Sequence, residues 1–523
     1  MMVFGCVPGR RKRAALAILI GSVLLAGAAS AQTLRTVINA DIRGLMPGKS
    51  PDISTGSVLQ NVYEGLVAWR SDGSVAPMLA DKIEVSADKQ TYTFTLRDGI
   101  TFHNGAPLTA REVVWTWQRF LDPKSAWPCR GNFDGSNAIK VESVQALDDG
   151  HVAFHLASPS GALLSAMARA DCDSTGIAHP ASVDAEGNWI AAIGTGPFKL
   201  SEWRKGQFVE LSRFDGYKPR SEAADGLAGA KIAKVEKVRI ELIPDAQSTK
   251  LALFQGKIDL WPEADSNQVK ELQQNPSVTV LTTPLAAIYA LPLQTRDPVL
   301  ADKRIRQAIN YAIDRGSLSG ALFDGKVPAS ASLIPATSAF YGPVQKTGAE
   351  FDPAKAKALI AAAGYKGERI VILTNKQNAV MADTAIYVQA MLREVGLNAD
   401  VEVLEFGAQF ERYYAGRYQM MVWNVTPYLD PLFIVERFTG DKARQADKPW
   451  DNPKARDLLK SLFAESDAAK RQALYDDLQR LYLDDMPMVV WGTRVSSTAV
   501  RRNVVGFEGW PGQKPRFWGV SVN

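Results

Sequence analysis

A stretch in the first quarter of the chain constrains the fold most, because its residue pattern specifies two kinds of local structure in succession. Thr91–Leu96 alternates polar and apolar residues as a half-buried strand does, and a turn containing Gly99 leads to a second short strand, Ile100–Phe102. Thr109 and Glu112 then have the spacing of a capping box at the start of an amphipathic helix. The stretch therefore predicts a β-hairpin followed by a helix, and local physics alone assigns it no role beyond packing.

The N-terminus has the pattern of a secretory leader. Four basic residues at 10–13 precede the apolar run 14–28, and the small residues at 29–31 form a cleavage site before Gln32. A membrane anchor is the alternative, but the run is shorter than the about 20 residues that a span requires, and no second run follows. Cys6 precedes the apolar run, whereas a lipoprotein cysteine directly follows the cleavage site. We therefore expect residues 1–31 to be a cleaved signal peptide and the mature protein to be free in the periplasm, not lipidated.

Removal of this leader changes the charge of the protein. The whole chain has 60 Lys and Arg against 56 Asp and Glu, a formal charge of +4, and the leader holds four basic and no acidic residues. The mature chain is therefore formally neutral. A nucleic-acid partner would need a basic surface that displaces counterions, so we expect none. The remaining length of about 490 residues suffices for two or three domains.

Two cysteines remain once the leader is gone, Cys129 and Cys172. In an oxidising compartment the simplest expectation is a disulfide between them. The alternative is two separately buried thiols, because a sequence does not show whether the two Cα atoms come within bonding range.

The C-terminal half of the chain alternates helical and strand patterns. Asp302–Ile313 is an amphipathic helix, Arg369–Thr374 and Ala399–Glu405 are strands, and the helix Asp383–Val395 lies between these strands and ends before Gly396. Such alternation predicts an α/β domain with a largely parallel sheet.

Several segments of the chain resemble one known family. The string LRDGITFHNG at 96–105, followed by TAREV at 109–113, is similar to the signature of the family 5 extracytoplasmic solute-binding proteins, the oligopeptide- and dipeptide-binding components of ABC importers. Further family-like segments, in family order, are YEGL at 63–66, GTGPF at 194–198, ALFQGKID at 252–259, RIRQAINYAIDR at 304–315 and FDP at 351–353.

The resemblance covers nearly the whole mature chain and implies an architecture. It is an α/β, two-lobed periplasmic-binding-protein fold (type II, cluster C-like) with an extra inserted domain. The expected limits are 32–68, 193–286 and 486–523 for a discontinuous lobe I, 69–192 for the inserted domain packed on it, and 287–485 for lobe II. The resemblance also implies a monomer that binds a small solute, serves the membrane permease subunits of an ABC importer, and has neither enzymatic activity nor a cofactor.

The resemblance places the solute between the lobes. The loop Arg43–Thr55 lies in the cleft of the peptide-binding relatives, and counting back from YEGL selects Asp52, Ile53 and Ser54; an ordinary surface loop is the alternative. A second group follows the predicted strand Tyr418–Val422, because loops beyond the carboxyl ends of strands bind ligands in open α/β sheets. This group comprises Trp423, Asn424, Val425 and Thr426, and two further positions that resemble cleft-lining ones are Phe406 and Trp491.

The chain departs from the peptide-binding pattern at one of these positions. In those relatives an aspartate three positions after the tryptophan holds the peptide's ammonium group, and Thr426 stands there in this chain. A hydroxyl does not offset the charge that is desolvated when a cleft closes. The solute classes left open are short peptides, opines and sugar or amino-acid conjugates. If peptides bind, another acid, such as Asp430 or Asp52, would hold the ammonium.

Two other function classes have little support in the sequence. A secreted hydrolase has no basis in the sequence, because the chain has four histidines and neither a G-x-S-x-G nor an H-E-x-x-H motif. A family 5 binder of a metal chelate or haem would need soft or imidazole ligands, which are scarce. We therefore expect no metal site and no catalytic residues.

Overall fold

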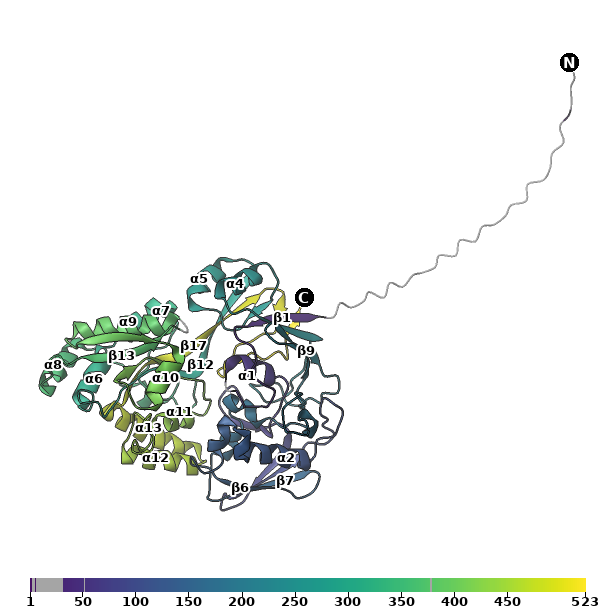
Figure 1. Cartoon of the computed structure of the whole chain (residues 1–523), viewed down its shortest axis with the longest axis horizontal. Coiled ribbons are helices and arrows are strands. Elements are labelled where there is room, and N and C mark those ends of the chain that lie inside the picture. Colours follow the sequence, from purple (N-terminus) through teal and green to yellow (C-terminus); the bar gives the residue numbers. More distant parts are fainter. Residues whose placement is uncertain (2–4, 6–31, 51, 377–378) are drawn as a thin grey trace.

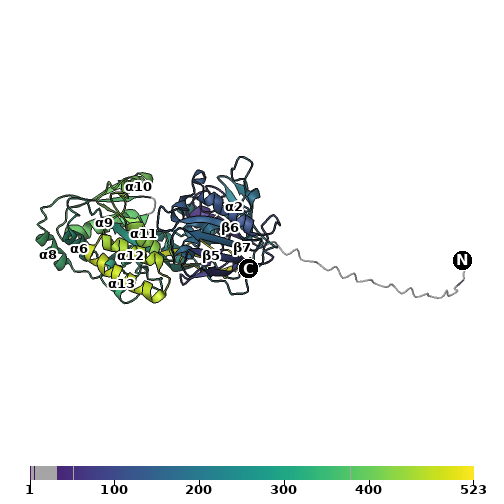
Figure 2. The ribbon, with the colours of Figure 1, turned by 90° about the horizontal axis from the view of Figure 1, so that it is seen from below.

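The computed structural model describes residues 1, 5, 32–50, 52–376 and 379–523, so the predicted signal peptide lies almost entirely outside the described residues. The described chain folds into two lobes of mixed α/β structure (Figure 1). A second view shows the two bodies side by side (Figure 2). Among the described residues, no helix combines the length and the apolar character that a membrane span needs.

The first lobe is built on a four-stranded sheet with the strand order β1-β10-β9-β8. β1 runs parallel to β10, and the other pairs are antiparallel. The apolar residues of this sheet pack against α1 and against Phe517 and Val520 near the C-terminus. The elements of this lobe are β1 (Thr33–Ile38), α1 (Ile53–Leu59), β8 (Phe198–Arg204), β9 (Phe208–Arg213), β10 (Lys237–Leu242), α4 (Ala246–Phe254), β11 (Leu260–Trp261), α5 (Val269–Gln274), β18 (Val504–Val505) and β19 (Ser521–Val522).

A second, fully antiparallel sheet follows with the order β4-β5-β7-β6 and lies on the same side of the molecule. Helix α2 packs on it through Val113, Trp117 and Phe120, all of them fully buried. Its elements are β2 (Val67–Trp69), β3 (Val75–Pro77), β4 (Ala80–Val85), β5 (Thr91–Leu96), α2 (Ala110–Leu121), β6 (Val141–Ala146), β7 (His151–Leu156) and α3 (Leu163–Met167).

Strand β5 has the predicted bounds and helix α2 begins after the predicted cap Thr109, but the predicted hairpin between Thr91–Leu96 and Ile100–Phe102 is wrong. The capping box of Thr109 and Glu112 is present. β5 pairs with β4 on one edge and β7 on the other, so neither edge is free for residues 100–102. Thr101 instead forms an isolated bridge to Pro107.

The second lobe holds the predicted parallel sheet, in the order β14-β13-β15. The strands are β13 (Ile370–Asn375), β14 (Ala399–Leu404) and β15 (Met420–Met421). The helices are α6 (Lys303–Ala312), α7 (Arg315–Phe323), α8 (Pro353–Ala363), α9 (Ala379–Glu394), α10 (Phe406–Tyr414), α11 (Leu432–Phe438), α12 (Pro453–Ala464) and α13 (Ala468–Asp485).

Two long antiparallel strands connect the lobes (Figure 1). β12 (Val278–Pro292) and β17 (Met488–Arg501) form a sheet in the order β11-β17-β12-β16, where β16 is Trp423–Asn424. One end of the pair therefore adds to the first lobe through β11 and the other to the second lobe through β16. Because both strands belong to both lobes, the limits expected near residues 287 and 486 stay predictions.

The register between β12 and β17 is irregular at the crossing point. Pro284 pairs with Val495 and Ile288 pairs with Thr493, so Arg494 lies opposite three residues, 285–287. A bulge of this kind bends a strand and re-aims the side chains beside it, which makes this the natural place for a change of direction between lobes.

Candidate ligand-binding site

On the side of the first lobe, the residues Asp52–Ser54 begin a helix. Asp52 is the N-cap of α1, and its carboxylate accepts hydrogen bonds of 2.8 Å from the backbone nitrogen and the hydroxyl of Thr55. Ile53 is exposed, and buried Ser54 donates to Asn39 Oδ1 over 3.3 Å. The segment predicted as a loop up to residue 55 therefore becomes helical at Ile53, because Asp52 caps its first turn.

A buried ion pair holds α1 in place. Lys514 Nζ lies 2.9 Å from Asp173 Oδ1, and both side chains are almost fully buried. Asp173 Oδ2 accepts a 2.8 Å hydrogen bond from the backbone nitrogen of Gly48, in the segment before α1. Gly56 of α1 makes room for the lysine, since a Cβ there would lie 2.0 Å from Lys514 Nζ. The pair thus ties together the segment before α1, α1 itself and the C-terminal segment.

The aspartate of this pair lies in a strained segment. Asp173, Ser174 and Thr175 have φ values of 48°, 53° and 46°, the left-handed region that residues with a Cβ avoid. Such conformations persist only where the surroundings over-determine them. The Lys514–Asp173 pair supplies one such constraint.

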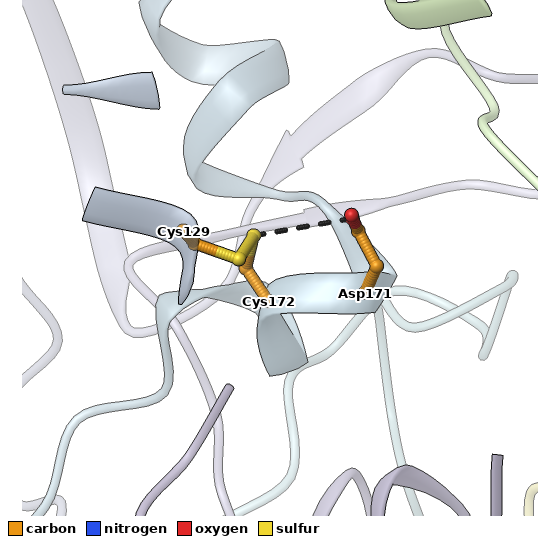
Figure 3. Close-up of side chains that lie close together, drawn as sticks. All are labelled: Cys129, Asp171 and Cys172. Atoms are coloured by element: carbon orange, nitrogen blue, oxygen red, sulfur yellow. Dashed lines mark hydrogen bonds between the residues drawn. A yellow bond between two sulfur atoms is a disulfide. The ribbon is translucent and has the colours of Figure 1, made fainter. Parts of the chain in front are cut away.

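A disulfide supplies the other constraint on this segment. Cys129 and Cys172 are joined, with their Cα atoms 6.0 Å apart, and an Asp171 oxygen lies 3.9 Å from Cys172 Sγ (Figure 3). In the described part of the chain, these three side chains are the one group of Cys, His and acidic residues close enough to share a metal ion. Metals bind the thiolate form of cysteine, and both sulfurs here belong to the disulfide, so the group is a covalent crosslink beside a carboxylate.

Arg169 brings this segment into contact with the second lobe. Its guanidinium pairs with Asp171 over 2.7 Å and lies over the rings of Tyr428, 5.1 Å from the centroid, and Phe433, 4.6 Å from the centroid. Glu436 Oε2 lies 4.0 Å from the same guanidinium, and burial raises the pKa of that carboxyl. The backbone nitrogen of Gly161 also donates to Phe463 O over 2.9 Å. The two lobes are therefore in direct contact.

On the side of the second lobe, Trp423 is mostly enclosed. Its side chain is 8% exposed, and its ring packs edge-on against Tyr413, Phe410 and Phe438, with centroids 4.4, 4.9 and 5.5 Å away. Phe406 begins α10, is 40% exposed and packs on Phe410 at 4.8 Å. An aromatic path therefore runs from the buried tryptophan to the surface.

The residues after Trp423 are held by their backbone. Asn424 pairs with Tyr289 of β12, and Val425 donates its backbone hydrogen to Ile288 O over 3.0 Å. Thr426 is exposed. Asp430 is buried and accepts hydrogen bonds from Arg471 and Tyr475 over 2.8 and 3.1 Å. Like Asp52, then, Asp430 already has protein partners.

Sequence reasoning missed a polar group at the crossing of β12 and β17, which we name the hinge cluster: Glu263, Tyr289, Arg494 and Gln513. Arg494 Nη1 donates to Val425 O over 2.6 Å, and Gln513 Nε2 donates to Glu263 Oε1. Burial raises the pKa of Tyr289 to about 12, and that of Glu263 is raised for the same reason. The sequence did contain one signal for this polar group: Arg494 places a charged residue shortly after the apolar run 488–491 of a predicted strand.

Trp491, the last predicted position, lies beside this cluster. Its ring stacks on Tyr289, with centroids 4.3 Å apart and planes 12° from parallel, and it is 1% exposed. β12 thus brings Trp491 and Trp423–Thr426 to one region. Within the described residues, no hydrogen bond or ion pair joins this region to Asp52–Ser54, so the site assignments stay predictions.

Two cavities of the second lobe lie apart from all these positions. One, of about 530 Å³, lies between the C-terminal end of α10 and residues 294–297; the other, of about 650 Å³, lies among α6, α8 and residues 483–486. Neither is lined by any residue predicted to bind the solute.

Comparison with known proteins decides the family. The family model of the bacterial extracellular solute-binding proteins, family 5, matches residues 74–445, more than two thirds of the chain. The chain belongs to this family. A family 5 relationship was expected from the LRDGITFHNG and TAREV strings, and it is confirmed.

Relatives of this family 5 protein agree with the fold. A dipeptide-binding protein of Escherichia coli (strain K12) is 26% identical over 547 residues, which cover 98% of this chain and 99% of the relative. The solved structure of AgaA from A. tumefaciens R10 with agropinic acid has a TM-score of 0.77 at 24% identity, covering 94% and 99% of the two chains. DppA from Helicobacter pylori, solved with a peptide, has a TM-score of 0.78 at 24% identity, covering 94% and 98%. The expected two-lobed α/β fold is confirmed.

Proposed function

We propose that this family 5 protein is a periplasmic receptor that captures a small polar solute between its lobes and delivers it to the permease of an ABC importer. The solute is a short peptide, an opine or a sugar or amino-acid conjugate. The observation that carries the proposal is the pair of strands β12 and β17, whose opposite ends belong to different lobes. Such a connection lets two rigid bodies hinge around a ligand.

The contacts between the lobes support this mechanism. Arg169 against Tyr428 and Phe433, and Gly161 against Phe463, join residues of different lobes. A ligand favours the closed state through interactions that it does not make in the open state. The direct contacts between the lobes stabilise the closed state in addition to those ligand interactions. The named ligands of relatives, a dipeptide and agropinic acid, supply the solute classes.

The proposed ligand contacts are the start of α1 on one side and residues 423–426, with Phe406 and Trp491, on the other. Hydrolysis needs a nucleophile beside a base. Of the two hydroxyl residues in this set, Ser54 bonds to an amide oxygen of Asn39 and Thr426 is exposed, and the set contains no histidine. We therefore propose binding without catalysis, by a monomer.

Mass spectrometry of small molecules released on denaturing the purified protein tests the proposal, followed by calorimetry with the solute found. We expect one dominant small polar solute that rebinds. Osmotic shock without detergent should release the protein with Gln32 at its N-terminus. Recovery of most of the protein in the membrane pellet would refute the free periplasmic state. Absence of any bound or rebinding solute across peptide, opine and sugar panels would refute the receptor function.

A further inference from the structure

The cavity of about 530 Å³ in the second lobe lies on one face of the parallel sheet, beyond the end of a helix. Val371 and Leu373 are two residues apart on β13, so their side chains share a face, and Glu402 of β14 is the register partner of Leu373. Helix α10 lies beside β13 (Figure 1) and reaches this face through Arg412, which pairs with Glu402. Because α10 ends at Tyr414, it leaves this part of the face to the cavity.

The chain turns where α10 ends, and a glycine permits the turn. Gly416 has a φ of 66°, and a Cβ there would lie 2.9 Å from Ala446 O. Gln294 Nε2 donates to Gly416 O over 2.9 Å and so joins the turn to the segment after β12. Gly416, Ala446 and Gln294 all line the cavity, so its walls are held together by contacts within the protein.

Three guanidiniums and two carboxylates line the cavity, and both carboxylates are already engaged. Glu402 pairs with Arg412 through both oxygens, over 3.0 and 2.9 Å. Asp297 accepts from two backbone nitrogens with one oxygen and from a side-chain amide with the other. Neither acid is therefore paired with the other two guanidiniums, those of Arg296 and Arg417.

These two guanidiniums have only weak compensation from the surface. Arg417 meets Glu411 over 3.1 Å, and both side chains are mostly exposed, an arrangement that contributes little free energy. Arg296 meets Asp451 over 3.4 Å, and Asp451 is shared with Arg456. The lining of the cavity therefore has an excess of positive charge.

A buried cation lies behind one wall of the cavity and adds to this excess. Lys442 is almost fully buried, and its ammonium donates to Gln294 Oε1 and Thr295 Oγ1, each over 2.5 Å. Among the described residues, no ion pair within 4.0 Å involves this ammonium. Burial, and after it the charge of Arg296, lowers the pKa of Lys442 to about 7. An anion in the cavity would stabilise the charged form of this lysine.

The cavity also has an apolar part, formed by Val371, Leu373, Ala446 and Tyr418. The hydroxyl of Tyr418 is buried and has no hydrogen-bond partner among the described residues. Small-molecule sites combine an apolar lining with a few polar groups, and a volume of about 530 Å³ is within their usual range. The lining therefore matches a small molecule with one carboxylate and an apolar body.

We infer that this cavity is a second binding site, apart from the proposed solute cleft, for a small carboxylic acid with an aromatic ring. Arg296 and Arg417 bind the carboxylate, and the ring lies against Val371, Leu373 and Tyr418. The inference does not depend on the proposed receptor function, because no residue of the cavity is among the predicted solute contacts.

The experiment measures the binding of three acids to the full mature chain by ligand-observed NMR titration. The probes are benzoate, phenylacetate and indole-3-acetate, each compared with its uncharged amide. We expect at least one acid to bind with a Kd of about 1 mM or below. Its amide should bind at least about tenfold more weakly, because it loses a charge-assisted hydrogen bond.

Two variants place the acid in this cavity, each with a matched control. Ala415 is exposed and lines the cavity, so Ala415→Trp should block it and abolish acid binding, whereas Ala361→Trp, at an exposed position of α8, should match the wild type. Arg417→Gln should weaken acid binding about tenfold. Arg480→Gln, which removes a similarly exposed arginine from its pair with Asp477, should leave it unchanged.

Each other outcome overturns the inference. Failure of all three acids to bind, equal binding of acid and amide, or unchanged acid binding in Ala415→Trp would do so, and the last result would place the acid elsewhere on the protein. Should Ala415→Trp not fold, unchanged acid affinity in Arg417→Gln overturns the inference in its place. The receptor function is judged separately, by the solute released from the purified protein.

Discussion

The two sides of the proposed cleft are held by different chemistry. The start of α1 depends on one buried ion pair, Lys514–Asp173, and on a strained segment crosslinked through Cys172. The loop that begins at Trp423 depends instead on packing, with three aromatic rings around the tryptophan. Removing one partner of a buried ion pair leaves the other charge uncompensated, so the folded state loses the whole contribution of the pair in one step. A packed aromatic cluster instead loses stability in proportion to the atoms removed. The comparison therefore predicts that single substitutions cause large losses in the free energy of unfolding at the start of α1, and smaller losses, in proportion to the atoms removed, around Trp423.

The largest expected effect comes from the disulfide. The bond closes a loop with a sequence separation of 43, for which the chain-entropy model gives about 4 kcal/mol of stability. A double Cys129→Ser, Cys172→Ser variant should lose about this free energy of unfolding in urea titration, compared with wild type under identical conditions. Two titratable thiols in the non-reduced, unfolded wild type would contradict the crosslink itself.

The next effect tests the ion pair. Lys514→Met leaves Asp173 buried without its cation, and we expect a loss of about 3 kcal/mol in the free energy of unfolding. Adding Asp173→Asn should recover part of that loss, because the neutral amide needs no counter-charge. If the double variant were no more stable than the single one, the lysine would act through packing rather than charge.

Removal of a lobe–lobe contact should have a smaller effect and should act on binding. Arg169→Met loses the cation–π contacts with Tyr428 and Phe433, each worth about 1 kcal/mol, so the binding free energy for the released solute should weaken by about 2 kcal/mol. Arg119→Met is the matched control. Arg119 makes the same kind of cation–π contact with Trp115, but both residues lie on helix α2, so the contact does not join the lobes. Calorimetry should show wild-type affinity for the control, and equal losses in both variants would exclude a closing contact.

The smallest effect tests the aromatic side. Trp423→Phe keeps a ring in the cluster, so we expect a loss of about 1 kcal/mol in the free energy of unfolding. If the exposed part of Trp423 contacts the solute, the binding free energy should also weaken, by about 1 kcal/mol. Thermal unfolding and calorimetry on the same sample separate the two. Unchanged affinity would remove Trp423 from the ligand contacts and leave it as core.

Local patterns in the sequence predicted local structure well. The alternation of Thr91–Leu96 and the capping box at Thr109 describe interactions among neighbours, and the structure has both. The hairpin failed because β4 and β7, from elsewhere in the chain, occupy the edges of β5. The sequence also contains a signal for the helix that begins at Ile53. Asp52 is an N-cap residue type, and Thr55, three residues later, supplies the backbone N–H from which its carboxylate accepts a hydrogen bond.

The hinge cluster was beyond sequence reasoning. Glu263 and Gln513 are 250 positions apart, and neither lies in a motif. Their meeting depends on a bulge in β12 that no residue pattern announces, since Leu285, Ala286 and Ala287 are ordinary strand residues. The same limit applies to Arg169, whose aromatic partners come from the other lobe.

The sharing of β17 between the lobes has a consequence for the order in which the chain folds. Residues 488–501 are synthesised after all the described helices of the second lobe, yet they complete the sheet that carries β11 of the first lobe and β16 of the second. Phe517 and Val520, later still, fill the core beside β1, the first strand of the chain. A growing polypeptide therefore keeps both lobes incomplete until residues 488–520 have been made, and any fragment that stops before Met488 leaves two incomplete lobes rather than one finished lobe.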